Sequence, residues 1–405
     1  MAFLDRINFA FAAISMNKEL GLTAATFGLA GTIMYTGYFA FEVPSNILLV
    51  KFGARRWISR IMITWGIASA ATAAVSSPMG VYIVRFIVGV AEAGFLPGVL
   101  LYVTYWVPTK RRARATSLFM IAQPIAIGFG SLLSGLIMSH TDQTLGLSGW
   151  QWMFILEGVP AVILGLFALS YLPDGPRSAK WLTQVEKDSV IVALEAEPSG
   201  IPGKVGFAEF ATLPFIMIGV ANFALITGLN ALATWSPLII QEVVGKNAEF
   251  LKIGLLSAIP GVLAAIAMPL LAASSDRKSE RAWHYGISAI IAVLGWLLVA
   301  SSMSISGRVS GLVLATAFGF GSMPILWSIP AAILTPKARP IGLAILSAIG
   351  ILGSVTSPSV VGVLRDITGS FNAGIYYAAA LTALSAVLFV PVARSVAKAG
   401  TGKQS

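Results

Sequence analysis

Residues 79–107 read MGVYIVRFIVGVAEAGFLPGVLLYVTYWV, an apolar run that contains two charged side chains, Arg85 and Glu92. A helix that crosses the roughly 30 Å hydrocarbon core of a bilayer needs about 20 apolar residues. The run therefore predicts a transmembrane helix. Ten further runs of similar size cover approximately residues 25–50, 58–77, 116–139, 151–172, 211–240, 250–273, 283–303, 308–334, 341–364 and 372–396.

The composition of the whole chain is typical of an integral membrane protein. Of its 405 residues, 57% are hydrophobic and 11% are charged, whereas soluble domains carry about 25% charged residues. The net charge of +10 is distributed in short clusters between apolar runs, which argues against a nucleic-acid-binding patch. The chain has no cysteine, and its two histidines, His140 and His284, are far apart. We therefore expect no metal site.

The N-terminal segment from Met1 to about Met16 is apolar but short, because sixteen helical residues rise only about 24 Å. It has neither a basic n-region nor a small-residue cleavage site, so a signal peptide does not fit. We interpret it as the outer part of a first transmembrane helix whose beginning is missing. The expected fold is therefore an all-α integral membrane protein with twelve transmembrane helices.

The distribution of basic residues predicts the topology. With the helices numbered 1 to 12, 20 of the 27 Lys and Arg residues fall in the even-numbered loops and the C-terminal tail. Two, Arg6 and Arg85, lie inside helices, and the odd-numbered loops hold Lys18, Lys246, Lys252, Arg308 and Arg365. Because basic residues concentrate in cytoplasmic loops, we expect the even-numbered loops and both termini to face the cytoplasm.

The longest polar stretch lies between the sixth and seventh apolar runs, and it divides the chain into halves. Residues 108–114 after helix 4 are echoed by residues 335–339 after helix 10, and residues 130–135 in helix 5 by residues 353–358 in helix 11. Two related halves joined by a linker are typical of transporters whose substrate site lies between the repeats. The expected units are an N-terminal six-helix bundle (1–172), a cytoplasmic linker (173–210) and a C-terminal six-helix bundle with a short tail (211–405).

Ionisable side chains within the spans mark the candidate functional site, because burying one in hydrocarbon costs at least about 2.5–3.5 kcal/mol. At 1.5 Å of rise per residue, Asp5 and Glu92 both lie about 20 Å from the outer surface. Asp5 is next to Arg6 in the sequence, and Glu92 is two helical turns from Arg85. The alternative is a set of purely structural salt bridges, but buried pairs add little net stability. The six such residues are Asp5, Arg6, Glu42, Arg85, Glu92 and Glu157.

The chemistry of these groups suggests their roles. A guanidinium matches a carboxylate bidentately, so Arg6 or Arg85 suits an anionic substrate. Burial favours the neutral form of a carboxyl, so Asp5 and Glu92 can take up and release protons. Glu42 and Glu157 lie nearer the helix ends, where packing, capping or gating is expected. Further candidates for substrate contact are Tyr38, Gln123, Trp327, Ser328 and Ser347, although such residues more often serve packing.

With these residues in view, the chain resembles the major facilitator superfamily and, within it, the anion:cation symporter family. The resemblance covers nearly the whole chain. It implies that Asp5 and Glu92 couple protons, that Arg6 and Arg85 bind the anion, and that Tyr38 and Gln123 contact the substrate. The supporting segments are residues 3–8 (FLDRIN), 53–57 (GARRW), 85–94 (RFIVGVAEAG), 171–174 (YLPD), 179–182 (AKWL) and 327–330 (WSIP).

Some positions depart from the family pattern. The superfamily signature between helices 2 and 3 resembles G-x-x-x-D-R-x-G-R-R, and here Asn46 and Val50 replace its Gly and Asp. Relatives often carry Asn at the position of Ser347. The Gly-Pro signature of drug exporters in helix 5 is absent, and Gln123-Pro124 stands there, which argues against efflux. The residues expected to form gating contacts are Arg55, Arg56, Asp276 and Arg277.

We therefore expect a proton-coupled importer of a small organic acid anion, a monomer in the bacterial inner membrane with the proton as its coupling ion and no other cofactor. An exchanger or uniporter that uses the same arginines is the alternative. A membrane enzyme is disfavoured because no nucleophile–base pair or phosphate loop occurs, and a sensor because no signalling domain is appended. Tartrate, phthalate, hydroxyphenylacetate and aldonates are candidate substrates.

Overall fold

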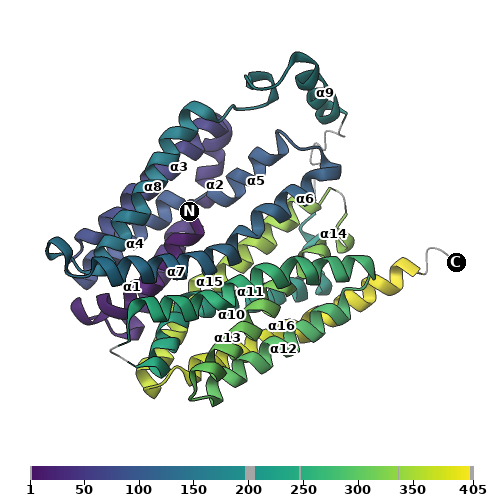
Figure 1. Cartoon of the computed structure of the whole chain (residues 1–405). Helices are drawn as coiled ribbons and strands as arrows, with labels where there is room; N and C mark the ends of the chain where they lie inside the picture. The colour runs from purple at the N-terminus through teal and green to yellow at the C-terminus, as the bar shows by residue number, and fades with distance from the viewer. Residues whose placement is uncertain (1, 197–205, 246–247, 336, 402–405) are drawn as a thin grey trace.

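The computed structural model describes residues 2–196, 206–245, 248–335 and 337–401, and their regular structure is helical (Figure 1). Part of the expected linker (197–205) and Lys246 lie outside these ranges. The α-helices are α1 Ala2–Glu19, α2 Ala24–Phe52, α3 Ala54–Ala71, α4 Pro78–Glu92, α5 Phe95–Thr104, α6 Thr109–Met120, α7 Ala122–Thr141, α8 Gly149–Tyr171, α9 Gln184–Glu195, α10 Leu213–Val244, α11 Phe250–Arg277, α12 Ala282–Ser301, α13 Ile305–Ser328, α14 Pro330–Ile333, α15 Arg339–Thr368 and α16 Asn372–Thr401.

Each of the twelve expected segments corresponds to a helix or to a pair of consecutive helices, so the all-α prediction is confirmed for the described residues. Nine of these segments, from Pro78–Thr104 to Asn372–Lys398, are long and apolar enough to cross a membrane. The helices α1, α2 and α3 are more polar: α1 carries Asp5 and Arg6, α2 carries Glu42, and α3 begins with an arginine pair.

The apolar run 79–107, expected as one helix, is broken into α4 and α5 at Ala93 and Gly94. Gly94 has φ +82°, a left-handed conformation that glycine adopts without steric cost. A Cβ at this position would lie 2.5 Å from the Ser45 Oγ of α2. The break therefore lets the chain turn directly after Glu92 where it passes close to α2.

Four of the five basic residues expected in odd-numbered loops are helical. Arg308 lies in the first turn of α13, and Arg365 lies in the last turn of α15. Lys18 and Lys252 likewise fall within the end turns of α1 and α11. The loop prediction was wrong because these helices extend past the ends of the apolar runs, where polar side chains can reach water or one another.

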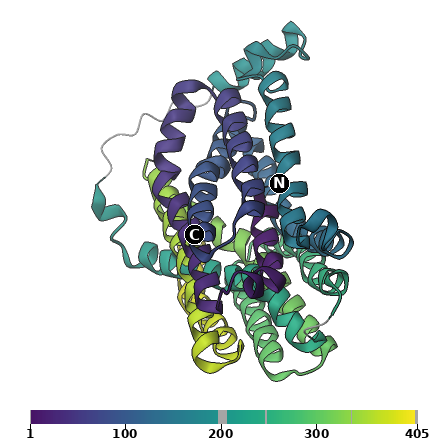
Figure 2. The same cartoon turned by 90° about the vertical axis from the view of Figure 1, so that its left-hand side faces the viewer.

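Close packing of small residues joins the helices. Within α1–α8, α3 packs on α8, with Gly66 facing Gly158. The later helices α10–α16 meet this group along two contacts, α2 with α15 and α7 with α11. In the second contact, a Cβ on Gly135 of α7 would lie 2.9 Å from the Cα of Gly254. Figure 2 shows the same helices after a 90° turn of the molecule. Such approaches are typical of helices packed in a bilayer.

Hydrogen bonds join the two groups of helices at one end of the molecule, which we call the Asp366 end. The Asp366 carboxylate accepts hydrogen bonds from the backbone N–H groups of Ala24 (3.1 Å) and Ala25 (2.8 Å), the first residues of α2. The backbone N–H of Leu251 donates to Ser139 Oγ at 2.8 Å. Toward the opposite end, which carries α9, the helices α3 and α8 lean away from α12 and α16 (Figure 1).

Candidate functional site

Helices α1 and α4 bring the four central charged residues together in two crosswise ion pairs. Arg6 Nη2 lies 2.8 Å from Glu92 Oε1, and Arg85 Nη1 lies 3.3 Å from Asp5 Oδ2. Arg85 and Glu92 are seven residues apart on α4, which places them on one face of that helix. Each guanidinium therefore neutralises a carboxylate of the other helix.

The two arginines differ in accessibility. Arg85 is 2% exposed, its Nη2 contacts Met34 Sδ at 3.0 Å, and its guanidinium lies 4.1 Å from the centre of the Phe9 ring. The Arg6 side chain is 23% exposed and faces the rings of Tyr35 and Tyr38 at 5.3 and 5.8 Å. Arg6 can thus meet a solute, whereas Arg85 is enclosed by protein.

Each carboxylate also has a distinct environment. Asp5 and Glu92 are both 2% exposed. Asp5 accepts a second hydrogen bond from the Ser69 hydroxyl of α3. Glu92 has no such second partner, because its Oε2 is buried and makes no hydrogen bond. The Arg6–Glu92 pair is therefore the less completely satisfied of the two, and a ligand or a proton can replace part of it at lower cost.

The cluster continues toward the C-terminal helices through a polar chain that the sequence analysis missed. The Tyr35 hydroxyl donates to Asn230 Oδ1 of α10 at 2.7 Å, and Asn230 Nδ2 donates to Ser354 Oγ of α15 at 2.7 Å. The signal was available, since Asn230 is an amide within an apolar run. Which partner it meets could be known only from the fold.

The remaining predicted substrate residues are spread over several helices. Tyr38 is buried beside Arg6, as described above. Gln123 lies partly buried near the start of α7, and Ser347 is exposed on α15. Trp327 and Ser328 end α13, where Ser328 Oγ donates to the Ile325 carbonyl. Within the described part of the chain, no hydrogen bond or ion pair joins Gln123, Trp327, Ser328 or Ser347 to the charged cluster.

Two of the predicted gating residues contact residues at or just beyond the ends of helices in their own group. The backbone N–H of Arg55 donates to Asp174 Oδ1 at 2.9 Å, and Asp276 Oδ1 lies 2.6 Å from Arg281 Nη2. Arg56 and Arg277 are exposed. Each of these two contacts therefore lies within one group of helices rather than between the groups.

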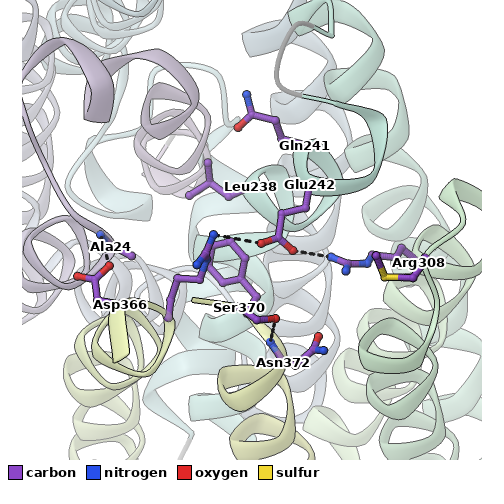
Figure 3. Close-up of a pocket in the computed structure, with 11 residues that line it drawn as sticks. Ala24, Leu238, Gln241, Glu242, Arg308, Asp366, Ser370 and Asn372 are labelled. Atoms are coloured by element: carbon purple, nitrogen blue, oxygen red, sulfur yellow. Dashed lines mark hydrogen bonds and ion pairs between the residues drawn. The ribbon is translucent and has the colours of Figure 1, made fainter. Parts of the chain in front are cut away.

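A second charged cluster, not predicted from the sequence, lines a pocket of about 700 Å³ at the Asp366 end (Figure 3). Glu242 of α10 lies between two arginines, 2.9 Å from Arg308 Nη1 and 3.4 Å from Arg365 Nη2. Arg308 is 3% exposed. Beyond these charged groups and Asp366, the lining includes Ala24, Leu238, Gln241, Met303, Ser370, Phe371 and Asn372.

Metal chemistry gains no support from this geometry. Among the residues that the structure describes, no group of three or more His, Cys, Asp or Glu side chains is placed to hold a metal ion. The chemistry that the central cluster can perform is recognition of an anion by Arg6 and exchange of protons at carboxyl groups.

Comparison with known proteins supports a transport role. A protein of Agrobacterium vitis named "Putative tartrate transporter" is 42% identical over 98% of this chain and 88% of its own length. A protein of Acinetobacter baumannii named "Quinolone resistance transporter" is 34% identical over 93% of this chain and 87% of its own length.

The fold has solved counterparts. One is the crystal structure of a bacterial homolog of the human lysosomal transporter Spinster, in an inward-facing and unoccupied conformation. The match covers 98% of this chain and 95% of the homolog's chain, with a TM-score of 0.74 and 18% sequence identity. The sequence model described as the Major Facilitator Superfamily matches residues 1–334. The chain is thus a multi-pass membrane transport protein rather than an enzyme, and it belongs to the major facilitator superfamily.

Proposed function

We propose that this protein imports a small organic acid anion together with a proton across the inner membrane of a bacterium. The observation that carries the proposal is the partly exposed Arg6 paired with the buried Glu92 at 2.8 Å. A proton on Glu92 removes the negative charge that holds Arg6, and its guanidinium is then free to receive a substrate carboxylate bidentately. Proton binding and anion binding thereby favour each other.

The Asp5–Arg85 pair supports coupling in a different way. Because Arg85 is enclosed by protein, its role is to stabilise charge on Asp5 rather than to meet the substrate. Protonation of Asp5 leaves the Arg85 charge uncompensated in a buried place, which is costly. We infer that this cost makes the protonated form favour a conformation in which Arg85 has different surroundings.

The orientation follows from the basic residues. The positive-inside rule places the α9 end, with most of the Lys and Arg residues, in the cytoplasm together with both termini. Residues 1–172 and 211–405 then move as two bundles about the site, with 173–210 as the linker. The charged cluster comes from one chain, so a monomer suffices for transport.

The substrate class is a small carboxylic acid. The name of the 42% identical relative points to tartrate, and the guanidinium of Arg6 suits a carboxylate group. A thermal-shift screen of the purified protein with tartrate, phthalate, hydroxyphenylacetate and an aldonate ranks these acids. The name of the 34% identical relative makes a quinolone the necessary comparison compound. Stabilisation by the quinolone alone would overturn the assignment of an organic acid.

The Asp5→Asn variant in proteoliposomes tests proton coupling. Asparagine cannot release a proton, so we expect uptake driven by a pH gradient to be lost while exchange of labelled for unlabelled substrate continues. If the protein were an exchanger or uniporter, the Asp5→Asn variant and the unchanged protein would transport the substrate alike. Intact uphill uptake by the variant would therefore exclude Asp5 as the coupling group.

A further inference from the structure

Glu157 of α8 is a third buried carboxyl in the N-terminal helices, and it lies outside the two central ion pairs. Its side chain is 7% exposed. Oε1 accepts a hydrogen bond from Ser134 Oγ of α7 at 3.1 Å, whereas Oε2 is buried and has no hydrogen-bond partner. Asp5 and Glu92 each have an arginine, but among the described residues no Lys, Arg or His lies within 4.0 Å of Glu157.

Among the described residues, the helices packed against α8 place no Lys, Arg or His side chain beside Glu157. On α1, Asp5 has the same sign as an ionised Glu157, and the Asn8 side chain lies within hydrogen-bonding reach of Glu157. On α3, Gly66 and Ala70 face Gly158, and the first arginine toward the α9 end is Arg60. Ten residues separate Arg60 from Ala70, about 15 Å of helix.

On α7 the polar contact is Ser134, and the titratable side chain of that helix is His140 at its far end. The ring Nδ1 of His140 lies 2.9 Å from the Leu136 carbonyl oxygen. Six residues, about 9 Å of helix, separate His140 from Ser134. An ionised Glu157 would therefore be an uncompensated charge within a membrane-spanning helix, at a cost of several kcal/mol.

Counting hydrogens at Ser134 leads to the same conclusion. Its Oγ lies 3.1 Å from Glu157 Oε1 and 3.4 Å from Asn8 Oδ1. A hydroxyl has one proton to donate, so with Asn8 Oδ1 facing Ser134 an ionised Glu157 and this oxygen compete for that proton. A protonated Glu157 can instead donate to Ser134 Oγ, and the Ser134 hydroxyl proton then goes to Asn8. The neutral acid satisfies both contacts.

We propose that Glu157 is a third proton-binding group of the transport cycle, protonated in the conformation seen here. The proposal rests on proton-coupled transport as the function. From Gly149, eight residues place Glu157 about 12 Å inside the Asp366 end, whereas Asp5 lies about 20 Å inside it. Glu157 therefore binds its proton on the outer side of Asp5. When the Asp366 end opens, water reaches the carboxyl, which takes up its proton from the outside, and it releases this proton toward the cytoplasm after the α9 end opens.

Infrared spectroscopy of the purified protein tests the protonation. We expect the C=O stretching band of a protonated carboxyl at neutral pH, and expect Glu157→Gln to abolish it. Glu92→Gln is the matched control, because Glu92 is buried to a similar degree but is paired with Arg6 and contributes no such band. Ser134→Ala should shift the band to higher frequency by removing the hydrogen bond. The band shift in Ser134→Ala tests the same assignment if Glu157→Gln does not fold. A spectrum without the band, or a band unchanged in both Glu157→Gln and Ser134→Ala, overturns the proposal.

Transport by the same variant tests the link to coupling. Each co-transported proton multiplies the equilibrium accumulation of substrate by about ten per pH unit of gradient, since one pH unit is worth about 1.36 kcal/mol. We expect Glu157→Gln to accumulate about tenfold less substrate at a gradient of one pH unit, with exchange retained. Unchanged accumulation makes Glu157 a permanently neutral structural acid and overturns its role in coupling. The Asp5→Asn assay tests proton coupling independently of Glu157. If that assay fails, the infrared band still reports whether Glu157 is protonated.

Discussion

At the scale of single residues, two arginines that are alike in sequence context have different surroundings. Both lie in apolar helices and both pair with a carboxylate. Arg85 is enclosed by Asp5, Met34 and the Phe9 ring, whereas part of the Arg6 side chain is exposed. A partly exposed guanidinium can exchange partners, and a fully enclosed one is held by what surrounds it. We therefore assign recognition to Arg6 and charge compensation to Arg85.

Lysine substitution at Arg6 tests the recognition role. Lysine keeps the charge but loses the planar fork, so Arg6→Lys should weaken substrate binding about tenfold, or about 1.4 kcal/mol, with little change in thermal unfolding. Calorimetric titration and unfolding curves measure the two effects. Unchanged affinity would show that the fork of Arg6 does not hold the substrate.

Removing the charge at the second arginine should affect stability instead. Arg85→Ala leaves Asp5 as an unpaired buried carboxylate, and breaking a buried pair in this way costs about 3–5 kcal/mol. Asp5→Asn combined with Arg85→Ala should recover much of that loss in thermal unfolding. A stable Arg85→Ala protein that no longer binds substrate would instead make Arg85 a direct ligand.

At the scale of the helices, the break between α4 and α5 makes Glu92 the last residue of α4. Two residues in the run 79–107 are signs of a break, Gly94 and Pro97, and Pro97 falls in the first turn of α5, where proline is tolerated. The left-handed conformation and the proximity of Ser45 explain why glycine occupies the position.

A pair of glycine substitutions tests this explanation. Gly94→Ala should destabilise the protein by more than the roughly 1–2 kcal/mol that a left-handed alanine costs, because its Cβ would also meet Ser45 Oγ. Gly21→Ala is the matched control, since Gly21 has φ +67° but no atom within 4 Å of the added Cβ. Thermal unfolding in the same detergent compares them. Equal losses in the two variants would mean that the contact with α2 does not constrain Gly94.

At the scale of the whole molecule, the Asp366 carboxylate ties the first turn of α2 to the last turn of α15. A carboxylate at a helix N-terminus is stabilised both by the free N–H groups and by the helix dipole. An ion pair with Glu242 holds Arg365, the residue next to Asp366. The bonds from Asp366 join helices of the two groups, so they favour a conformation that is closed at this end.

Asp366→Ala should therefore shift the population toward a conformation that is open at the Asp366 end. Because the chain has no cysteine, a spin-label pair can be introduced at the exposed positions Met79 and Met303, and pulsed electron resonance then measures their separation. We expect a longer-distance population in Asp366→Ala.

The control for this measurement is Asp142→Ala. Asp142 Oδ1 likewise accepts from a helix N-terminus, the backbone N–H of Gly149 at 2.8 Å, but within one group of helices. Its loss should lower stability without changing the Met79–Met303 distances. The same distance shift in both variants would mean that general loosening, rather than a contact between the two groups, is responsible.

The sequence by itself determined the membrane-spanning helices and the candidate charges, because both depend on local properties. Hydrophobic run length decides whether a helix can span a bilayer, and the rise per residue placed Asp5 and Glu92 at matching depth. Family resemblance added the roles expected of Asp5, Arg6, Arg85 and Glu92. These inferences need no knowledge of which helices are neighbours.

The tertiary structure decided which groups are partners. Arg6 meets Glu92 across 86 residues of chain, and Tyr35 meets Asn230 across 195. The Arg308–Glu242 contact and the absence of a cation beside Glu157 among the described residues are likewise set by the packing of helices far apart in sequence. Charge pairing depends on distances of a few ångströms between side chains, and only the packed helices fix those distances.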